Sequence, residues 1–366
     1  MSYWFYPILN LALAQTTPAE QGSIRVKVVD ADNNQPIPFA LVYFSKTTIG
    51  GYTDANGVVD IKKIPYGSYE MIASEVSHKP SQRRLVIKST QTLHLTVQLL
   101  VRTLQEVEVR GKRDDKWNRQ YSRFQKLFFG NEHYKDCKII NPAMIDFKIV
   151  QGQFVAESHE PLKIENNYLG YNLEFDLKTC VFASAEFLIT GNVRFEEKKG
   201  SDSLKAIWKK NREEAYRGSP PHFLRSMIDS SMRQVGYEMY NDLTSDANIV
   251  RLPNFSFNLQ KNIEGTSTRK RVKPLDNGTY SIEFPYRLEV HYMRRRAPND
   301  VYRNVTHPIS WLEVKGESKL IINHDGIVQN PEVLTVLGKM SDPARGRMAP
   351  DRLSVHRCSL ANPGSC

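Results

Sequence analysis

Short stretches of alternating apolar and polar residues, separated by turn residues about every ten positions, fill the segment 23–110. Ile24, Val26 and Val28, for example, alternate with polar neighbours. Alternation with a period of two gives a strand one apolar face, and strands at this spacing are typical of a small β-sandwich. The other runs of this kind are Phe39, Leu41 and Tyr43; Tyr69, Met71 and Ala73; Leu85 and Ile87; and Leu93, Leu95, Val97 and Leu99.

The residues between these runs favour tight turns. Asp32-Asn33-Asn34 precedes Pro36, and two further turn sequences are Asp54-Ala55-Asn56-Gly57 and Pro65-Tyr66-Gly67. An Asp at the start of a turn accepts backbone N–H groups, and a Gly at its end tolerates a positive φ. These turns support a sandwich without helices.

The same segment resembles a known family. The residues that carry the resemblance are Asp30, Pro36-Ile37-Pro38-Phe39-Ala40-x-Val42, Gly51-x-Thr53-Asp54-x-Asn56-Gly57, Ile61 and Ile64-Pro65-x-Gly67-x-Tyr69. They resemble the carboxypeptidase regulatory-like domain, a seven-stranded transthyretin-like or Ig-like β-sandwich found at the N-termini of TonB-dependent receptors and other envelope proteins of Gram-negative bacteria. The resemblance implies an interaction or spacer module and no catalysis. Val76–Pro80 replaces the family's usual Gly-aromatic pair, which predicts a remodelled edge.

A helix is predicted after the sandwich. Leu104–Val109 resembles the strand that follows this module in outer-membrane receptors, and Gly111–Arg113 is interpreted as a linker. An Asp cap at 114 or 115 then starts a helix that Gly130 ends. Its apolar stripe consists of Trp117, Tyr121, Phe124 and Phe128, whereas Arg119, Arg123 and Lys126 lie off the stripe and are interpreted as a solvated face.

The rest of the chain is predicted to be a β-rich α+β region with inserted helices. Helices are expected over Leu204–Tyr216 and after the Ser219-Pro220 cap. The polar segment 244–278 is interpreted as a long loop or weak strands. Strands are expected over 145–149, 171–178, 187–195, 280–293, 309–314 and 319–322, with a turn at Asn323–Gly326. The fold class is therefore mainly β.

The length of 366 residues fits two main units. We expect a signal segment at 1–22, the sandwich at 23–110, the β-rich region at 111–345 and a tail at 346–366. The signal is inferred from the apolar run Ile8–Ala14 and from Ala12-Leu13-Ala14, although no Lys or Arg precedes that run. Several segments between Trp117 and Ser226 resemble the β-rich region of unknown function that follows this sandwich in envelope proteins.

Four cysteines are too few and too scattered for a disulfide scaffold or a zinc site. Cys137 and Cys180 either pair in an oxidising compartment or stay as two buried thiols, and Cys358 and Cys366 lie in the tail. His159, His291, His307 and His324 do not form a metal-binding spacing, and no phosphate-binding glycine loop occurs. We therefore expect no catalytic residue, metal or cofactor.

The candidate contacts for a ligand or partner are two polar groups. His222 and Arg225 lie one turn apart on the helix that Ser219 caps, where backbone N–H groups favour an anion, although Ser219 is better explained as the helix cap. Arg294, Arg295 and Arg296 form a basic run that contributes to the net charge of +10. The segment 22–110 has 11 basic and 8 acidic residues, against 39 and 31 in 111–366, so the excess lies in the second region.

These patterns predict a non-enzymatic cell-envelope protein, exported to the periplasm or associated with the outer membrane. Its partners would be an envelope protein, a glycan or an anionic outer-membrane surface, and neither nucleic acid nor a transmembrane span after processing is expected. Two alternatives remain open. Exposed aromatic residues on β-sheets would suit a carbohydrate-binding or surface-adhesion protein, and a hydrolase site assembled from distant residues would leave no local motif.

Overall fold

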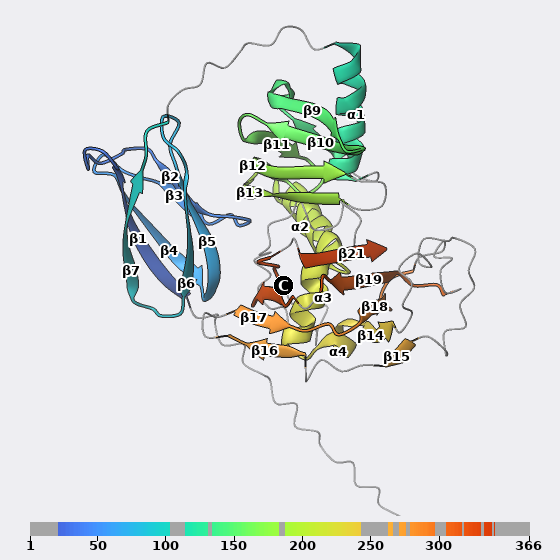
Figure 1. Ribbon diagram of the computed structural model, residues 1–366. Coiled ribbons are helices and arrows are strands. Elements are labelled where there is room, and N and C mark those ends of the chain that lie inside the picture. The colour runs from blue at the N-terminus through green and yellow to red at the C-terminus, as the bar shows by residue number, and fades with distance from the viewer. Residues whose placement is uncertain are drawn as a thin grey trace, which may run out of the picture.

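Seven strands at the N-terminus form two sheets that pack face to face, as the sequence predicts (Figure 1). In the computed structural model, the described residues are 21–102, 114–130, 134–182, 187–242, 263–265, 271–275, 279–296, 305–316, 318–330, 333–338 and 340. One sheet has the order β4-β1-β7, with β1 and β7 parallel, and the other has the order β3-β2-β5-β6. The strands are β1 (Gln21–Asp30), β2 (Leu41–Phe44), β3 (Gly50–Tyr52), β4 (Val58–Pro65), β5 (Gly67–Ser74), β6 (Ser81–Ile87) and β7 (Thr92–Leu99).

The core face of β2 differs from the prediction. Ala40, Val42 and Phe44 point into the sandwich core, so the predicted face of Phe39, Leu41 and Tyr43 is wrong. Phe39 lies before the strand with a φ of 56° and 77% of its surface exposed. Leu41 and Tyr43 are buried on the outer face of the sheet. Alternation along the strand does not predict that this outer face is buried as well.

The segment that departs from the family pattern forms a short edge pairing. The Lys79 N–H donates to Leu100 O at 2.7 Å, and His78 forms an isolated antiparallel bridge with Val101. The His78 ring lies between two carboxylates, with Nδ1 2.6 Å from Glu75 Oε2 and Nε2 3.2 Å from Asp30 Oδ2. Burial lowers the pKa of His78, but these two hydrogen bonds outweigh it and hold the pKa above its usual value.

A six-stranded sheet follows, with the order β8-β11-β12-β10-β9 and with β13 paired to β12. Helix α1 covers one side of it (Figure 1), and their shared core contains both Cys137 and Cys180, which are free thiols. Burial raises the pKa of Cys137 to about 12. The elements are α1 (Asp115–Phe129), β8 (Cys137–Ile139), β9 (Ile145–Val150), β10 (Gln153–Ser158), β11 (Leu162–Asn166), β12 (Tyr171–Phe182) and β13 (Phe187–Glu197), with 3-10 turns at Tyr134–Asp136 and Pro142–Met144.

Helix α2 (Asp202–Tyr216) packs on the turn between β11 and β12. Trp208 donates its ring N–H to Asn167 O at 3.0 Å, and the Arg212 guanidinium lies 3.8 Å from the centre of the Tyr171 ring. Gly170 has a φ of 71°, and a Cβ at this position would approach the Trp208 ring to 2.1 Å. Only glycine satisfies both the turn conformation and the close approach of the indole.

A third core is formed by two smaller sheets around helix α3. The sheets have the orders β15-β14-β18-β19-β21 and β16-β17-β20. The predicted strand over 280–293 is interrupted at 283–286, so it contributes one strand to each sheet. The elements are α3 (Pro220–Ile228), α4 (Met232–Val235), β14 (Tyr237–Asp242), β15 (Ile263–Gly265), β16 (Val272–Pro274), β17 (Thr279–Ile282), β18 (Arg287–Tyr292), β19 (Ile309–Val314), β20 (Leu320–Asn323) and β21 (Leu334–Gly338).

The sandwich contacts the six-stranded sheet at strand β13. The Lys46 N–H donates to Val193 O at 2.6 Å, and the Phe195 N–H donates to Thr47 O at 3.2 Å. Residues 45–47 therefore extend the sheet as a short parallel bridge. An unpaired strand edge invites pairing with other chains, and this contact covers part of that edge.

Apolar burial accompanies the backbone contact. Leu41, Tyr43 and Ile72 form a separate buried cluster on the outer face of β2 and β5. Burial, together with Asp176 and Glu174 of β12, raises the pKa of the Tyr43 hydroxyl. This outer face of the sandwich is thus an internal surface of the protein.

Several predictions lie outside the described residues. They concern the signal segment, the strand at Leu104–Val109, the linker at Gly111–Arg113, and the tail with Cys358 and Cys366. The segment 244–262 also lies outside, whereas β15 and β16 are short strands within the segment 244–278 that was interpreted as a long loop or weak strands.

Candidate functional site

Helix α1 is fixed at both ends and therefore presents its side chains in defined positions. The Asp114 side chain accepts the Trp117 N–H at 2.7 Å, which caps the N-terminus as predicted. Gly130 ends the helix with a φ of 83°, and its N–H donates to Lys126 O at 3.0 Å. Capping of this kind stabilises a helix by about 1 kcal/mol.

The aromatic stripe of α1 faces the six-stranded sheet. Phe124, Phe128 and Phe129 are buried, and Trp117 donates its ring N–H to Ile145 O at 2.9 Å. Trp117 also stacks on Tyr121 with 5.0 Å between ring centres. These contacts set the rotation of the helix about its axis, so the polar stripe lies on the side of the helix away from the buried core.

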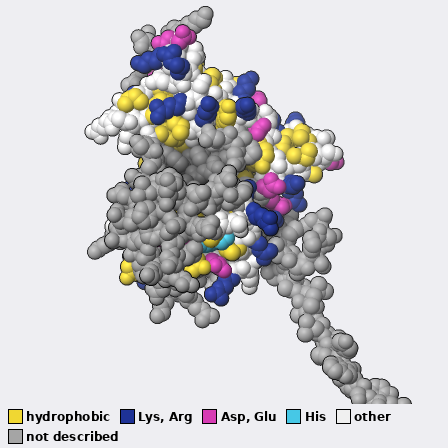
Figure 2. All heavy atoms as spheres, turned by 90° about the vertical axis from the view of Figure 1, so that its right-hand side faces the viewer, with side chains coloured by type: hydrophobic (Ala, Val, Ile, Leu, Met, Phe, Trp, Pro, Cys, Tyr) yellow, Lys and Arg dark blue, Asp and Glu magenta, His cyan; other side chains and the backbone are white. Residues whose placement is uncertain are grey.

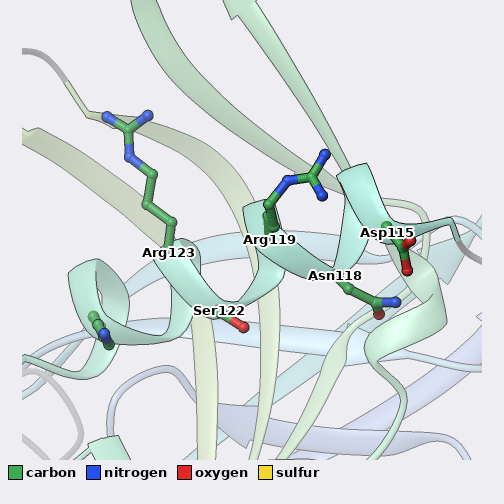
Figure 3. Close-up of a pocket in the computed structure, with 6 residues that line it drawn as sticks. Asp115, Asn118, Arg119, Ser122 and Arg123 are labelled. Carbon is green, nitrogen blue, oxygen red and sulfur yellow. The ribbon is translucent and has the colours of Figure 1, made fainter.

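The polar stripe lines a groove of about 590 Å³. Its described lining consists of Asp115, Asn118, Arg119, Ser122, Arg123 and Lys126. Arg119 and Arg123 extend from the same side of the helix, one turn apart (Figure 3). Figure 2 shows Lys and Arg side chains gathered on the upper part of this side of the molecule. We call the groove that these six residues line the α1 groove.

Two of the three cationic side chains of the groove lie over aromatic rings. The Arg123 guanidinium lies 4.7 Å from the centre of the buried Phe154 ring, and the Lys126 ammonium lies 5.9 Å from that of Tyr134. A cation over an aromatic face gains about 0.5–1 kcal/mol at an exposed site. The rings therefore restrict where these two charges lie before any ligand arrives.

The cations of the α1 groove have no acidic partner in the described structure. Arg119, Arg123 and Lys126 form no ion pair with a described residue. Positions three and four apart on a helix place their Cβ atoms about 5–6 Å apart, so the three charges form a row. Guanidinium groups bind carboxylate and phosphate through paired hydrogen bonds. The groove is therefore suited to an anionic group or to a chain of them.

A second hollow is less suited to an anion. It has a volume of about 200 Å³ and lies on the face of β11, β12 and β13. Its lining mixes cations and anions: Ile140, Lys163, Ile164, Glu165, Asn172, Leu173, Glu174, Arg194 and Glu196. The three carboxylates outnumber the two cations, so this surface does not attract a negative ligand.

The structure places the predicted contact His222 among buried aromatic rings. Its Nδ1 atom accepts the Gly218 N–H at 3.1 Å and lies 2.9 Å from the Tyr237 hydroxyl. Burial, followed by the charges of Arg217 and Arg225, lowers the pKa of His222 to about 4. A neutral, hydrogen-bonded imidazole of this kind supports the helix end.

The predicted arginines are not brought into one site. The Arg225 Nε atom lies 3.5 Å from Oδ2 of Asp229, the C-cap residue of the same helix. The Arg294 guanidinium donates to Gln234 O at 3.2 Å. Arg294 and Arg296 are exposed and Arg295 is half-buried in the turn after β18. Their role as a partner contact stays a prediction.

Sequence reasoning found the cations of the α1 groove but not the groove. The helical period already places Arg119, Arg123 and Lys126 off the apolar stripe. The sequence pattern alone does not single out Asn118 and Ser122, which complete the lining. Their signal was their position on the same stripe, three and seven residues after Asp115.

The described parts of the chain contain no cluster of three or more His, Cys, Asp or Glu side chains that could hold a metal ion. None of the described helices is long and apolar enough to cross a bilayer.

Comparison with protein families supports the sandwich. Residues 24–109 match the model of the CarboxypepD_reg-like domain, and the described part of that range forms the two sheets of β1–β7. No curated protein matches the chain. The chain therefore contains a CarboxypepD_reg-like domain followed by a β-rich region with a few helices.

Solved structures with partial similarity include two pilins and an enzyme. BcpA, the major pilin subunit of Bacillus cereus, is 20% identical over 22% of this chain and 30% of its own, with a TM-score of 0.20. Klebsiella pneumoniae 5-hydroxyisourate hydrolase is 19% identical over 22% of this chain and 90% of its own, with a TM-score of 0.20. GBS52, the minor pilin of Streptococcus agalactiae, is 18% identical over 25% of this chain and 48% of its own, with a TM-score of 0.20. The match thus spans under half the length of either pilin.

Proposed function

We propose that this protein is a non-enzymatic binding protein of the cell envelope. In this proposal the CarboxypepD_reg-like sandwich is a docking or spacer module, and the α1 groove binds an acidic glycan. The observation that carries the proposal is the row formed by Arg119, Arg123 and Lys126, which lines a groove and has no acidic partner among the described residues.

The form of the groove favours a chain over a single small anion. The row spans seven residues of helix, or about 10 Å at 1.5 Å per residue. A glycan with one carboxylate on each sugar offers regularly spaced anions, and Asn118 and Ser122 add hydrogen-bonding groups for hydroxyls.

The contact between the sandwich and β13 supports a spacer role. Backbone hydrogen bonds and a buried apolar cluster join the sandwich to the six-stranded sheet, so more than a linker connects them. A domain held in this way keeps a fixed position relative to the six-stranded sheet that α1 covers. The matched domain family and the predicted signal segment support the envelope as the location.

The binding test uses an oligogalacturonate as the acidic probe and maltohexaose as the neutral one. We expect the full chain to bind the oligogalacturonate in isothermal titration calorimetry at low salt. Each lost charge-assisted hydrogen bond is worth about 1.5 kcal/mol, so the double variant Arg119→Glu and Arg123→Glu should bind about 100-fold more weakly.

The matched control reverses two exposed charges elsewhere. Arg83 and Arg84 on β6 are exposed, and their change to Glu alters the net charge by the same amount. Equal losses in both double variants would show that only the net charge matters and would refute a site at α1. Equal binding of maltohexaose and oligogalacturonate would refute an acidic ligand.

A further inference from the structure

The segment that departs from the family pattern, Val76–Pro80, contributes to a largely buried group of three ionisable side chains. Asp30 lies at the end of β1, Glu75 follows β5, and the His78 ring lies between the two carboxylates. The exposed fractions of the Asp30, Glu75 and His78 side chains are 13%, 20% and 12%. A histidine changes its charge near neutral pH, so the contacts of this group depend on pH.

Only a protonated ring satisfies both carboxylates. His78 Nδ1 lies 2.6 Å from Glu75 Oε2, and Nε2 lies 3.2 Å from Asp30 Oδ2. An ionised carboxylate only accepts hydrogen bonds, and a neutral imidazole has a single N–H to donate. After the ring loses its proton, one ring nitrogen presents a lone pair to a carboxylate oxygen, and that contact becomes repulsive.

The backbone holds the two carboxylates in place. Asp30 Oδ1 accepts the Asp32 N–H at 2.8 Å, and Glu75 Oε2 accepts the Ser77 N–H at 2.8 Å. The Asp32 N–H, followed by the His78 ring, holds the pKa of Asp30 below its usual value. Burial raises the pKa of Glu75, but the hydrogen bonds from His78 and Ser77 outweigh it and keep this pKa low as well. Both carboxylates are therefore ionised near neutral pH, and the ring is the member that titrates.

The residues on either side of His78 hold the last described residues of the sandwich. The Lys79 N–H donates to Leu100 O at 2.7 Å, and the Arg102 N–H donates to Ser77 O at 2.7 Å. The ring and these two backbone bonds therefore belong to one short pairing.

We call residues 100–102, through which the chain leaves the sandwich, the exit segment. His78 forms an antiparallel bridge with Val101 at its centre. Leu100 and Val101 have 56% and 49% of their surface exposed, so little apolar burial adds to the backbone bonds. A pairing with few buried apolar contacts opens more readily than the core of a domain, so the loss of one further bond has a large effect on it.

The direction of the pH effect follows from the groups that face the ring. Asp30 from β1 and Glu75 from the segment of His78 itself both favour the charged ring. The other charged residues on the adjoining segments are exposed: Asp32, Lys79 and Arg102. Burial lowers the pKa of His78, but the two carboxylates outweigh it and hold this pKa above its usual value. The stabilisation is therefore complete below the pKa of the unfolded chain and is lost as the pH rises through that of the folded one.

We propose that His78 is a pH-sensitive switch that controls the pairing of the exit segment. While the ring is protonated, Asp30 and Glu75 hold it from both sides and the exit segment stays paired. Loss of the proton as the pH rises removes one of these bonds and loosens the pairing. None of these residues lines the α1 groove, so this inference and the proposed glycan binding stand independently.

The test is hydrogen exchange of the full chain at pH 5.5 and pH 8.5, measured by mass spectrometry and corrected for the intrinsic effect of pH on amide exchange. The loss of one charge-assisted hydrogen bond should lower the protection of the peptides that contain the Lys79 and Arg102 amides about 10-fold at the higher pH. Peptides from β2, which is buried throughout, are the internal reference and should keep their protection. An equal loss of protection in β2 would show unfolding of the whole sandwich and would contradict a local switch.

The variant His78→Gln has no titrating group at this position. Its exit segment should show the lower protection at both pH values. The matched control is His94→Gln, because His94 is an exposed histidine of β7 in the same sandwich, and its loss should leave the pH dependence unchanged. Circular dichroism checks that each variant is folded, and the wild-type comparison needs no variant at all. Equal protection of the exit segment at both pH values in the wild type, or an unchanged pH dependence in folded His78→Gln, would overturn the proposal.

Discussion

The burial of His222 predicts a specific loss of stability in acid. Its ring is surrounded by Tyr216, Tyr237 and Tyr292 and accepts the Gly218 N–H, so protonation would remove an acceptor and leave a charge among aromatic rings. The pKa is therefore about 4 in the folded protein, against 6.5 for a free histidine. The unfolded chain takes up the proton more readily than the folded one.

The sign and the size of the stability change follow from the linkage between proton binding and folding. Because the pKa of His222 is depressed by folding, its contribution is fully present above pH 6.5 and is lost as the pH falls towards 4. Each unit of difference corresponds to 1.36 kcal/mol, which sets a limit of about 3.4 kcal/mol. Between pH 7 and pH 4.5 the free energy of unfolding should fall by about 2.5 kcal/mol through this residue.

The assay compares urea unfolding of the wild type and of His222→Gln at both pH values. The variant loses stability at pH 7, but it has no proton to bind at this position. The drop in the free energy of unfolding from pH 7 to pH 4.5 should therefore be smaller in the variant by about 2.5 kcal/mol. Equal drops in both proteins would refute the depressed pKa, whatever the other titrating groups contribute.

Two further substitutions test the packing. Gly170→Ala would place a Cβ 2.1 Å from the Trp208 ring at a φ of 71°, whereas Gly152→Ala meets nothing within 4 Å at a φ of 77°. Thermal unfolding should show that Gly170→Ala lowers the free energy of unfolding by about 2–4 kcal/mol. Gly152→Ala should lower it by about 1 kcal/mol, because only the positive φ, and no steric clash, opposes the alanine there. A similar loss in both would show that Trp208 adapts. Asp242→Asn removes the negative charge of the buried Arg287–Asp242 pair and should destabilise the protein by about 3–5 kcal/mol in urea unfolding. Asp60→Asn, at the exposed pair with Arg25, should have little effect, and equal effects would contradict the role of burial.

Helices were predicted well because their signals are local. Asp114 and Ser219 both cap helices through side-chain hydrogen bonds, and Gly130 ends α1 as expected. Strands depend on distant partners, so their faces are harder to predict. The outer face of β2 is buried because residues 45–47 pair with β13, and alternation along β2 alone cannot report a contact made about 150 positions away in sequence.

The candidate sites show the same limit. The cations of α1 were visible as a stripe, but a stripe does not reveal whether it lines a groove. The alternation of Arg287, Glu289 and His291 with apolar residues suggests a solvent-facing side of a strand, yet all six positions of β18 are buried. The approach of His307 to His291 depends on the pairing of β18 with β19, which the sequence does not specify.

The complete burial of β18 bears on why its polar face exists. Apolar residues of similar size often match or exceed the stability that a buried ionic network provides. Arg287 pairs with Asp242 at 2.6 Å, and Glu289 is held by Trp311 and His291. The ion pair and the Glu289 chain could both be replaced by apolar packing if stability were the only requirement. The chain that ends at His307 differs from the ion pair, because it directs the lone pair of one imidazole at a second, half-buried one. A buried lone pair that meets a hydrogen-bond donor is satisfied, so the chain from Trp311 to His307 is explained as a structural network of β18 and β19.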